Sequence, residues 1–281
     1  MKYMEIIEAP EYLYHYTSLD KLALILKNRT IRLNSLDKMD DLQEQRGQDI
    51  KNIGRFVFVS SWTSSADESI PMWKMYTDLT SGVRIRLKSN PFQRKRTSQN
   101  AVRKKLDREK STEEEKDVFA DTFLDLAHLI DLGIFSPQAW SGDILSQVVY
   151  IDDKKFLEPP IATYTGSRIE LNLGPIGRYK NSGWSFQNEW RYIMYFYTMP
   201  FSIDARKTHE ELLQIVQRMS NGTEPAPIAY FDFPIEPTGF SNMEITASPQ
   251  LSPGNKILLD ALIEKYNPDA KLVESQYKGL L

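Results

Sequence analysis

One stretch, residues 184–197 with the sequence WSFQNEWRYIMYFY, constrains the fold of this chain more than any other. An aromatic run of this kind is typical of the buried part of a sheet, and it predicts a strand over Ser185–Phe196. Glu189 lies in the middle of this run, and a buried carboxylate is costly unless it has a partner, a ligand or an open cleft. The structural alternative is an edge-strand ion pair with Arg191, two residues on and on the same strand face.

Composition excludes several classes of protein. The 281 residues are 41% hydrophobic and 26% charged, as in an ordinary soluble globular chain with a sizeable core. The absence of cysteine excludes disulfides and thiolate sites and fits a reducing compartment. Three histidines far apart in the sequence argue against a zinc cluster; no metal site is predicted, although a carboxylate metal site stays open. No apolar run approaches the length of a signal peptide or a membrane span, so we expect a cytoplasmic protein without a membrane partner.

The pattern of strands and helices predicts an α+β fold in a single domain, 1–281, because the two kinds of element interleave without regular alternation. Asn34–Arg46 is polar and acidic and is expected to be a loop over the surface. The remaining strands are expected at Leu13–Tyr16, Ile31–Leu33, Phe56–Trp62, Val83–Leu87, Gln147–Ile151, Ile228–Phe233, Met243–Thr246 and Ala270–Glu274. Helices are expected at Ser18–Lys27, Glu68–Thr77, Glu210–Met219 and about 253–266.

A strongly charged segment interrupts this pattern. Arg84–Lys110 holds eleven Lys or Arg against two acids, and Glu113–Asp131 is then mostly acidic. We expect a mainly helical insertion at about 92–146, whose main helical part ends near Gly133. Two interpretations are open: a charged helical hairpin with solvated faces, or a surface that binds the phosphates of a nucleic acid. The phosphate contacts would come from Arg94, Lys95, Arg96, Arg103, Lys104 and Lys105.

The usual nucleotide-binding and hydrolase signatures are absent from the sequence. Short motifs of a less common kind are present. Tyr14-His15-Tyr16-Thr17 precedes an amphipathic helix, and Asn188-Glu189-Trp190 lies on a late strand. This combination resembles the ADP-ribosyltransferases of the H-Y-E type, in which a first strand bears His and then Ser or Thr, and a late strand bears Glu. Their middle element is an aromatic residue on a helix after a strand that ends in small hydroxyl residues, and Phe56–Ser61 followed by Glu68–Tyr76 has this order.

The resemblance covers most of the chain apart from the charged segment. The succession HYTSLDKLALIL, SSW, MWKMY and WSFQNEWRYI is similar to an uncharacterised bacterial family placed with this superfamily. Its first motif is also similar to the opening of the DarT-like toxins, which modify DNA. The fold that the resemblance implies is a split β-sheet core of the ADP-ribosyltransferase kind.

The resemblance also implies residues that hold NAD⁺ as the substrate. His15 would contact the adenosine ribose and Thr17 the nicotinamide amide, although each residue could instead cap the following helix. Ser60 and Ser61 would lie beneath the nicotinamide ring. Either Trp73 or Tyr76 would stack on that ring, and either could instead belong to the core.

Glu189 is implied as the catalytic residue, because a fixed carboxylate stabilises the cationic ribose that forms when nicotinamide leaves. Gln187, two residues earlier, would contact the acceptor, and its neutral amide argues against arginine and for an amide or a nucleobase. Arg191 would orient Glu189 or hold the diphosphate. No Gly-rich loop follows His15, so the further candidates for the diphosphate are Arg29, Arg32 and Lys180.

The resemblance and the basic segment together predict an NAD-dependent ADP-ribosyltransferase that modifies a macromolecule, with RNA or DNA preferred as acceptor. A bacterial toxin or a phage-defence effector would have this activity, and an inhibitory antitoxin protein would then be a partner. Two alternatives stay open: an NAD glycohydrolase, in which water replaces the acceptor, and a non-catalytic module that binds nucleic acid or protein.

Overall fold

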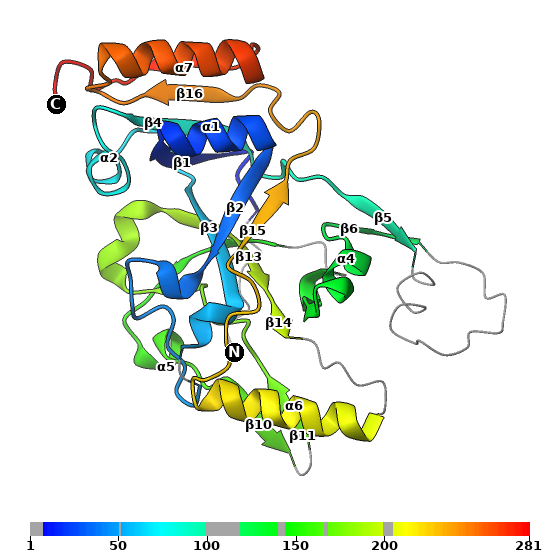
Figure 1. The fold of residues 1–281 in the computed structure, drawn as a ribbon. Coiled ribbons are helices and arrows are strands. Elements are labelled where there is room, and N and C mark those ends of the chain that lie inside the picture. The colour runs from blue at the N-terminus through cyan, green and yellow to red at the C-terminus, as the bar shows by residue number, and fades with distance from the viewer. Residues whose placement is uncertain (1–7, 51, 99–118, 140–143, 166–167, 199–204) are drawn as a thin grey trace.

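The computed structural model describes residues 8–50, 52–98, 119–139, 144–165, 168–198 and 205–281, and the elements below lie within these ranges. They form a mixed α+β fold, the class that the sequence predicts, around a nine-stranded sheet (Figure 1). The strands of this sheet are β1 (Tyr12–Ser18), β2 (Thr30–Ser35), β3 (Val57–Thr63), β4 (Gly82–Lys88), β8 (Leu145–Gln147), β13 (Glu189–Tyr195), β15 (Tyr230–Pro234), β16 (Glu244–Ala247) and β17 (Lys271–Glu274).

The large sheet forks at β3. One edge of β3 pairs with β13 over all seven residues, and β13 in turn pairs with β8. The other edge is shared: β2 pairs with Phe58 and Val59, whereas β1 pairs only where Tyr14 faces Thr63. In the part of the chain that the structure describes, residues 60–62 have no ladder partner on this edge. The sheet therefore consists of a half β8–β13–β3–β2–β15 and a half β1–β4–β16–β17, joined at one residue pair.

Three helices begin where the sequence predicts, for local reasons. α1 (Leu19–Asn28) connects β1 to β2 and buries Leu19, Leu22 and Leu26, which recur at helical spacing. α2 (Ile70–Tyr76) starts after Ser69, whose hydroxyl accepts a hydrogen bond from the backbone N–H of Met72. α7 (Pro253–Tyr266) has a serine cap and a proline in its first turn, and it packs beside α1 (Figure 1). The other helices are α4 (Leu126–Asp131), α5 (Lys154–Leu157) and α6 (Ala205–Ser220).

Two hydrophobic cores cover the two faces of the sheet at β3 and β13. Alternate residues of β13 enter different cores, with Tyr192 and Met194 in the larger and Ile193 and Tyr195 in the smaller. All seven residues of β13 are buried. Glu189 therefore lies at the start of a strand that is buried on both faces, which is the environment that the sequence predicts for it.

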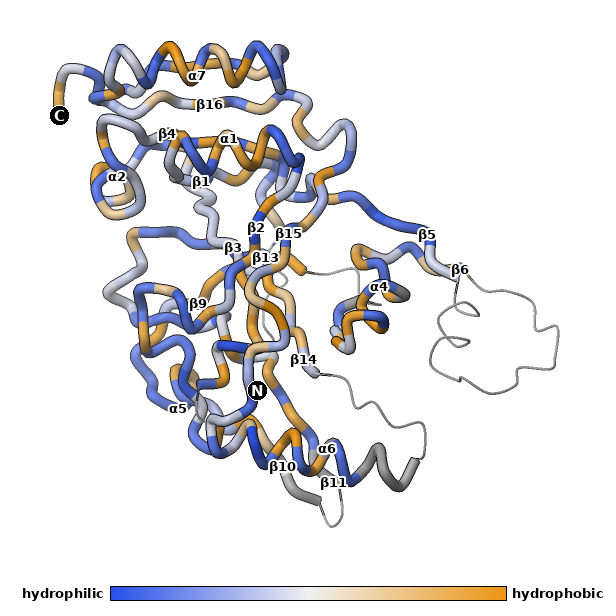
Figure 2. Tube along the Cα trace, in the orientation of Figure 1, coloured by the Kyte–Doolittle hydropathy of each residue, from blue (hydrophilic) through white to orange (hydrophobic). Residues whose placement is uncertain are grey.

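The expectation of a mainly helical insertion at about 92–146 is wrong for most of the described residues. β5 (Lys95–Ser98) and β6 (Phe119–Thr122) form an antiparallel pair that extends from the body of the protein and is hydrophilic along β5 (Figures 1 and 2). The hydroxyls of Thr97 and Thr122 are 2.9 Å apart across this pair, and β-branched residues favour such cross-strand contacts. In the described part of this segment, the helical elements are the short α4 and a 3₁₀ turn at Pro137–Ala139, and Gly133 after α4 has a φ of 68°, which is common where a helix ends. Arg103, Lys104 and Lys105 lie outside the described residues.

The predicted strand over Ser185–Phe196 begins later than expected. Ser182–Gln187 forms a 3₁₀ turn, Asn188 adopts the left-handed conformation with φ of 44°, and β13 starts at Glu189. Asn tolerates this conformation, so it allows the abrupt change from turn to strand. The remaining strands form small two-stranded sheets: β7 (Ile134–Phe135), β9 (Val149–Tyr150), β10 (Ala162–Thr165), β11 (Arg168–Leu171), β12 (Tyr179–Lys180) and β14 (Tyr197–Thr198). Among the described helices, none has the length and apolar character needed to cross a bilayer.

Candidate functional site

A cavity of about 560 Å³ lies where β1 and β2 diverge from β3, beneath α1. Its volume is in the range of small-molecule sites, which is roughly 300–1,000 Å³. Residues from distant parts of the sequence meet there, namely from β1, α1, β2, β3, α2, β13 and the loops near residues 40 and 184. Ten of the candidate residues line it: His15, Thr17, Arg32, Ser60, Ser61, Tyr76, Lys180, Gln187, Glu189 and Arg191.

His15 lies on β1 beside residues 60–62 of β3, which have no ladder partner on this edge. Its Nδ1 is 2.8 Å from the carbonyl oxygen of Ser61, which belongs to the unpaired stretch of β3. Because a carbonyl only accepts, Nδ1 carries the hydrogen, and Nε2 is left as an acceptor. The imidazole also packs on Trp62, with ring centroids 5.0 Å apart. Burial lowers the pKa of His15 to about 4 against the opposing effect of the Ser61 hydrogen bond, so the ring is neutral at pH 7.

The residues beside His15 complete a neutral wall. Thr17 is buried at the end of β1 and lines the cavity. Ser60 accepts a hydrogen bond from the indole N–H of Trp62 over 3.1 Å. Ser18 is the cap residue of α1 and makes no side-chain capping bond, and the ring of His15 bonds to β3 rather than to the helix. We call His15, Thr17, Ser60 and Trp62 the neutral wall.

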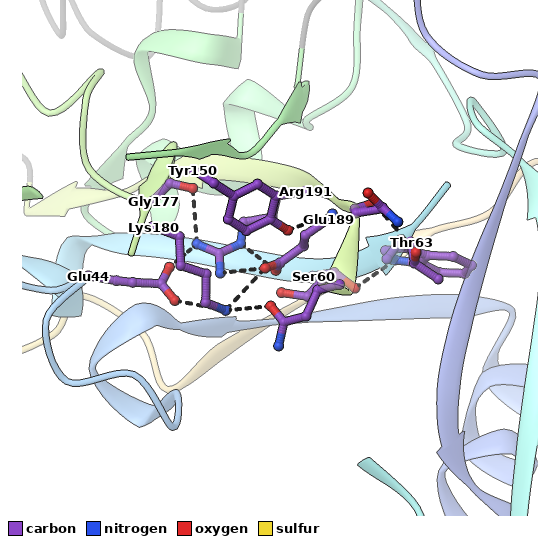
Figure 3. Close-up of polar contacts among 12 residues, drawn as sticks. Glu44, Ser60, Thr63, Tyr150, Gly177, Lys180, Glu189 and Arg191 are labelled. Atoms are coloured by element: carbon purple, nitrogen blue, oxygen red, sulfur yellow. Dashed lines mark hydrogen bonds and ion pairs between the residues drawn. The ribbon is translucent and has the colours of Figure 1, made fainter. Parts of the chain in front are cut away.

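Glu189 is 4% exposed and is held by two cations (Figure 3). Arg191 donates from Nε to Oε1 over 2.6 Å and from Nη2 to Oε2 over 3.1 Å, and Lys180 Nζ lies 3.1 Å from Oε2. The backbone N–H of Glu189 donates to the hydroxyl of Tyr150 over 2.9 Å. The ion pair between Glu189 and Arg191 that the sequence suggests is therefore present, but β13 is not an edge strand, because it pairs on both sides.

Glu44 is a residue of the site that the sequence analysis missed. It was assigned to a surface loop, yet its side chain is buried and contacts both cations of the cluster. Lys180 Nζ is 3.1 Å from Glu44 Oε1, and Arg191 Nη1 donates to Glu44 Oε2 and also to the carbonyl of Gly177 over 3.0 Å (Figure 3). The sequence held one indication that a second carboxylate is needed, because Glu189 alone cannot balance the charges of two buried cations. We call Glu44, Lys180, Glu189 and Arg191 the charged wall.

The charged wall fixes the ionisation of Glu189. Burial alone would raise the pKa of this carboxyl, but the charges of Arg191 and Lys180 and hydrogen bonds from Arg191 and Ser61 lower it to about 2. Burial likewise opposes the charge of Arg191, while Glu189 and Glu44 raise its pKa above the ordinary range. Glu189 is therefore a permanent anion in the folded protein and acts through its charge, not as a proton donor.

Gln187 and Tyr76 extend this network into the cavity. Gln187 is 3% exposed; its Oε1 accepts from Lys180 over 2.9 Å and its Nε2 donates to the hydroxyl of Tyr76. Burial, followed by the negative charge of Glu189, raises the pKa of Tyr76 to about 12, so the phenol stays neutral. Each end of the Gln187 amide is thus engaged by the protein itself, which leaves it one N–H and one lone pair for a ligand.

The structure separates the two aromatic candidates of α2. Tyr76 lines the cavity, whereas Trp73 is 0% exposed and does not. Trp73 packs edge to face on Tyr16, with centroids 4.9 Å apart, and its indole N–H donates to Glu68 over 2.8 Å. Trp73 is therefore a core residue, and its candidate role as a stacking partner for a ligand is wrong.

The three candidates for a diphosphate are placed differently from one another. Arg29 is not in the cavity lining, because its guanidinium donates to the carbonyls of Glu236 and Pro237 over 3.1 and 2.8 Å. Lys180 belongs to the charged wall, and Arg32 lines the cavity but is paired with a carboxylate, as described below.

The described part of the basic segment lies apart from the cavity lining. The guanidinium of Arg94 lies 4.3 Å from the ring centroid of Phe123, and that of Arg96 lies 4.8 Å from that of Phe119. Lys95 pairs with Asp125 over 3.5 Å. The candidate acceptor residues Arg94, Lys95 and Arg96 are thus on a separate hairpin from Gln187.

Comparison with known proteins gives one match. Residues 72–192 match the sequence profile of a family described as "Protein of unknown function (DUF2971)". The matched part carries Tyr76 and three members of the charged wall, whereas His15 and Thr17 precede it. No curated protein and no solved structure matches the chain. In the described ranges, no group of three or more His, Asp or Glu residues is positioned to hold a metal ion.

Proposed function

We propose that this protein is an NAD⁺-dependent ADP-ribosyltransferase whose reaction takes place at Glu189. One observation carries the proposal: His15, Thr17, Ser61, Tyr76 and Glu189, chosen from separate stretches of sequence, line a single cavity of suitable volume. The fork of the sheet at β3 supports it further, because it agrees with the split core that the resemblance implies.

The chemistry requires a fixed negative charge beside the ribose. When the bond between ribose C1 and nicotinamide breaks, the electron pair leaves with nicotinamide, and the ribose becomes an oxocarbenium-like cation. Glu189 stabilises this cation, since its carboxylate is ionised and already held by Arg191 and Lys180. No side chain has to reorient as the positive charge develops, which makes such stabilisation efficient.

The neutral wall supplies contacts that do not change during the reaction. Nε2 of neutral His15 is an acceptor suited to a sugar hydroxyl, and the hydroxyl of Thr17 suits an amide. Tyr76 offers an aromatic ring and a neutral hydroxyl on the side of the charged wall. These groups bind the substrate, whereas Glu189 acts on the bond that breaks.

The acceptor in this proposal is a macromolecule, with nucleic acid favoured because of the basic segment that includes Arg94, Lys95 and Arg96. A toxin or phage-defence role with an inhibitory protein partner is consistent with such an activity. One observation favours NAD⁺ hydrolysis as a second candidate: both ends of the Gln187 amide are engaged by Lys180 and Tyr76, so water is the acceptor that needs least space there.

Labelled NAD⁺ separates these functions. The protein is incubated with NAD⁺ labelled in the adenosine and with separate pools of DNA, RNA and protein. Label in a nucleic-acid pool supports the transferase with the favoured acceptor, and label in the protein pool changes the acceptor class. Release of free ADP-ribose and nicotinamide alone makes the protein a glycohydrolase. No consumption of NAD⁺ in any pool contradicts the proposal and leaves a non-catalytic binding module.

A pair of variants then tests the role of Glu189 in the reaction. Glu189→Gln removes the reactive charge and should lower turnover about 10²-fold or more. Glu44→Gln removes one negative charge from the same charged wall, so it should destabilise the protein to a similar degree but leave Glu189 in place. Both are assayed at equal concentrations of folded protein. Because turnover is compared per folded molecule, equal losses would show that Glu189 has no role in the reaction beyond the charge balance of the charged wall.

A further inference from the structure

Arg32 forms an ordered, planar surface at the rim of the cavity. Its guanidinium lies 3.6 Å from the ring centroid of Tyr230 and is paired with Asp232, Nε to Oδ1 over 2.7 Å and Nη2 to Oδ2 over 2.8 Å. Asp232 faces Arg32 directly across β2 and β15, and Tyr230 is on the same strand face. The side chain of Arg32 is still 42% exposed and lines the cavity.

This arrangement does not suit a phosphate. The edge of the guanidinium that carries Nε and Nη2 is taken by Asp232, and this carboxylate also neutralises the charge. One flat face is covered by Tyr230, and the exposed remainder of the group is directed to the cavity and solvent. What Arg32 offers a ligand is therefore a fixed flat surface, which matches the face of an aromatic ring.

We propose that Arg32, held by Asp232 and Tyr230, is a stacking platform for a planar heteroaromatic ring, namely a nucleobase, at the end of the cavity away from Glu189. Glu189 lies on β13 and Arg32 on β2, with β3 between them, so the two sites are separated by two strand spacings, roughly 10 Å. Polar side chains that can bond to the edge of a base, Asn28, Thr30 and Asn34, line the cavity around the platform.

The ring can come from two sources. If the function proposed above holds, it is the adenine of NAD⁺, and the platform deepens that function by assigning the adenine end of the substrate. An unpaired base of a nucleic-acid acceptor has the same stacking chemistry. Mononucleotides and single-stranded oligonucleotides distinguish these two sources.

The test compares two arginines with similar surroundings. Arg32→Lys keeps the positive charge and removes the flat surface. Arg86→Lys is the matched control, because Arg86 also lies over a tyrosine, 4.5 Å from the ring centroid of Tyr12, and pairs with Glu244 over 3.5 Å, but is not in the cavity lining. Thermal unfolding of both variants establishes that they are folded before binding is measured.

Binding is measured by calorimetry with AMP, ADP-ribose and nicotinamide mononucleotide. Arg32→Lys should weaken AMP and ADP-ribose about tenfold and leave nicotinamide mononucleotide unchanged, and Arg86→Lys should change none of them. A loss confined to a single-stranded oligonucleotide assigns the base to the acceptor. Unchanged binding of all these ligands in Arg32→Lys, equal loss for nicotinamide mononucleotide, or no binding of any base by the wild-type protein overturns the platform.

This result is independent of the test of the proposed function. Wild-type protein that consumes NAD⁺ while Arg32→Lys keeps full affinity for every base contradicts the platform alone. Wild-type protein that binds AMP through Arg32 but does not consume NAD⁺ contradicts the transferase alone.

Discussion

The two walls of the cavity differ in how their polar groups are satisfied. In the charged wall, each carboxylate contacts both cations, and Glu189 has contacts to Arg191, Lys180 and the hydroxyl of Ser61. In the neutral wall, His15 uses one ring nitrogen for the protein and keeps the other as an acceptor. The polar groups of the charged wall are satisfied by one another, whereas the neutral wall keeps one ring nitrogen of His15 as an acceptor available to a ligand.

The energetic basis of this difference is burial. Each buried charge of the charged wall loses several kcal/mol of solvation free energy, and only the contacts with its partners offset this loss. Removal of one of the four side chains therefore destabilises the other three. The neutral wall buries no charge, and its members contribute separately. Changes in the charged wall should therefore mainly alter stability and turnover, and changes in the neutral wall should mainly alter affinity.

The largest expected effect comes from unbalancing the charged wall. Lys180→Met leaves two carboxylates with one cation, and removal of one partner from such a buried cluster costs about 3–5 kcal/mol in the free energy of unfolding. Thr17→Val in the neutral wall should cost less than about 1 kcal/mol, because no buried partner is left behind. Urea unfolding of both variants measures the difference. Similar losses in the two variants would remove the distinction between the walls.

A smaller effect is expected on acidification, at a different pH for each wall. The lowered pKa of His15 means that the unfolded chain binds this proton between pH 6.5 and about 4 while the folded chain does not, so stability falls as the pH falls through this window. For Glu189 the corresponding loss occurs below about pH 4.5 and continues to about 2. One proton corresponds to at most about 1.4 kcal/mol per pH unit.

The variant His15→Gln assigns the first window. It should flatten the dependence of unfolding free energy on pH between 6.5 and 4 and leave the dependence below pH 4 as in the wild type. Denaturant unfolding at a series of pH values gives both slopes. A variant curve parallel to the wild-type curve throughout would mean that His15 does not titrate in that window.

The smallest effect concerns affinity. Under the proposed function, His15→Ala removes one acceptor for NAD⁺, worth about 1 kcal/mol, so KM should rise about fivefold with little change in kcat. This split follows from a contact that is the same in the ground state and the transition state. A fall in kcat with normal affinity would instead assign His15 to the chemical step. The two walls would then not differ in function.

Local signals predicted much of this structure from the sequence. Apolar spacing and helix caps located α1, α2 and α7 to within two residues, a continuous apolar run located β3, and alternation located β4. The candidate residues that line the cavity were selected from short motifs by their resemblance to a family, whereas Glu44 and Trp62, which also line it, were not selected. These features depend on a few neighbouring residues, which is why a single sequence reveals them.

Features that depend on distant partners were missed. Glu44 is buried only because Arg191, 147 residues away in sequence, meets it in the fold. Trp73 and Tyr76 share one helical face, and only the packing of α2 on Tyr16 decides which one enters the core. The charged segment was predicted as a helical hairpin because a basic stretch is followed by an acidic one, yet Lys95–Ser98 and Phe119–Thr122 pair as antiparallel strands.

The two walls come from different parts of the sequence, so they form at different times while the chain is synthesised. The neutral wall comes from residues 15–62 and can assemble soon after β3 leaves the ribosome, because its loop closures are short. The charged wall needs Glu44 to meet Lys180 and Arg191, so it cannot close until β13 has been translated. A nascent or truncated chain is therefore expected to be chemically inert even when its first strands have folded, and the proposed activity arises only in chains that extend through β13.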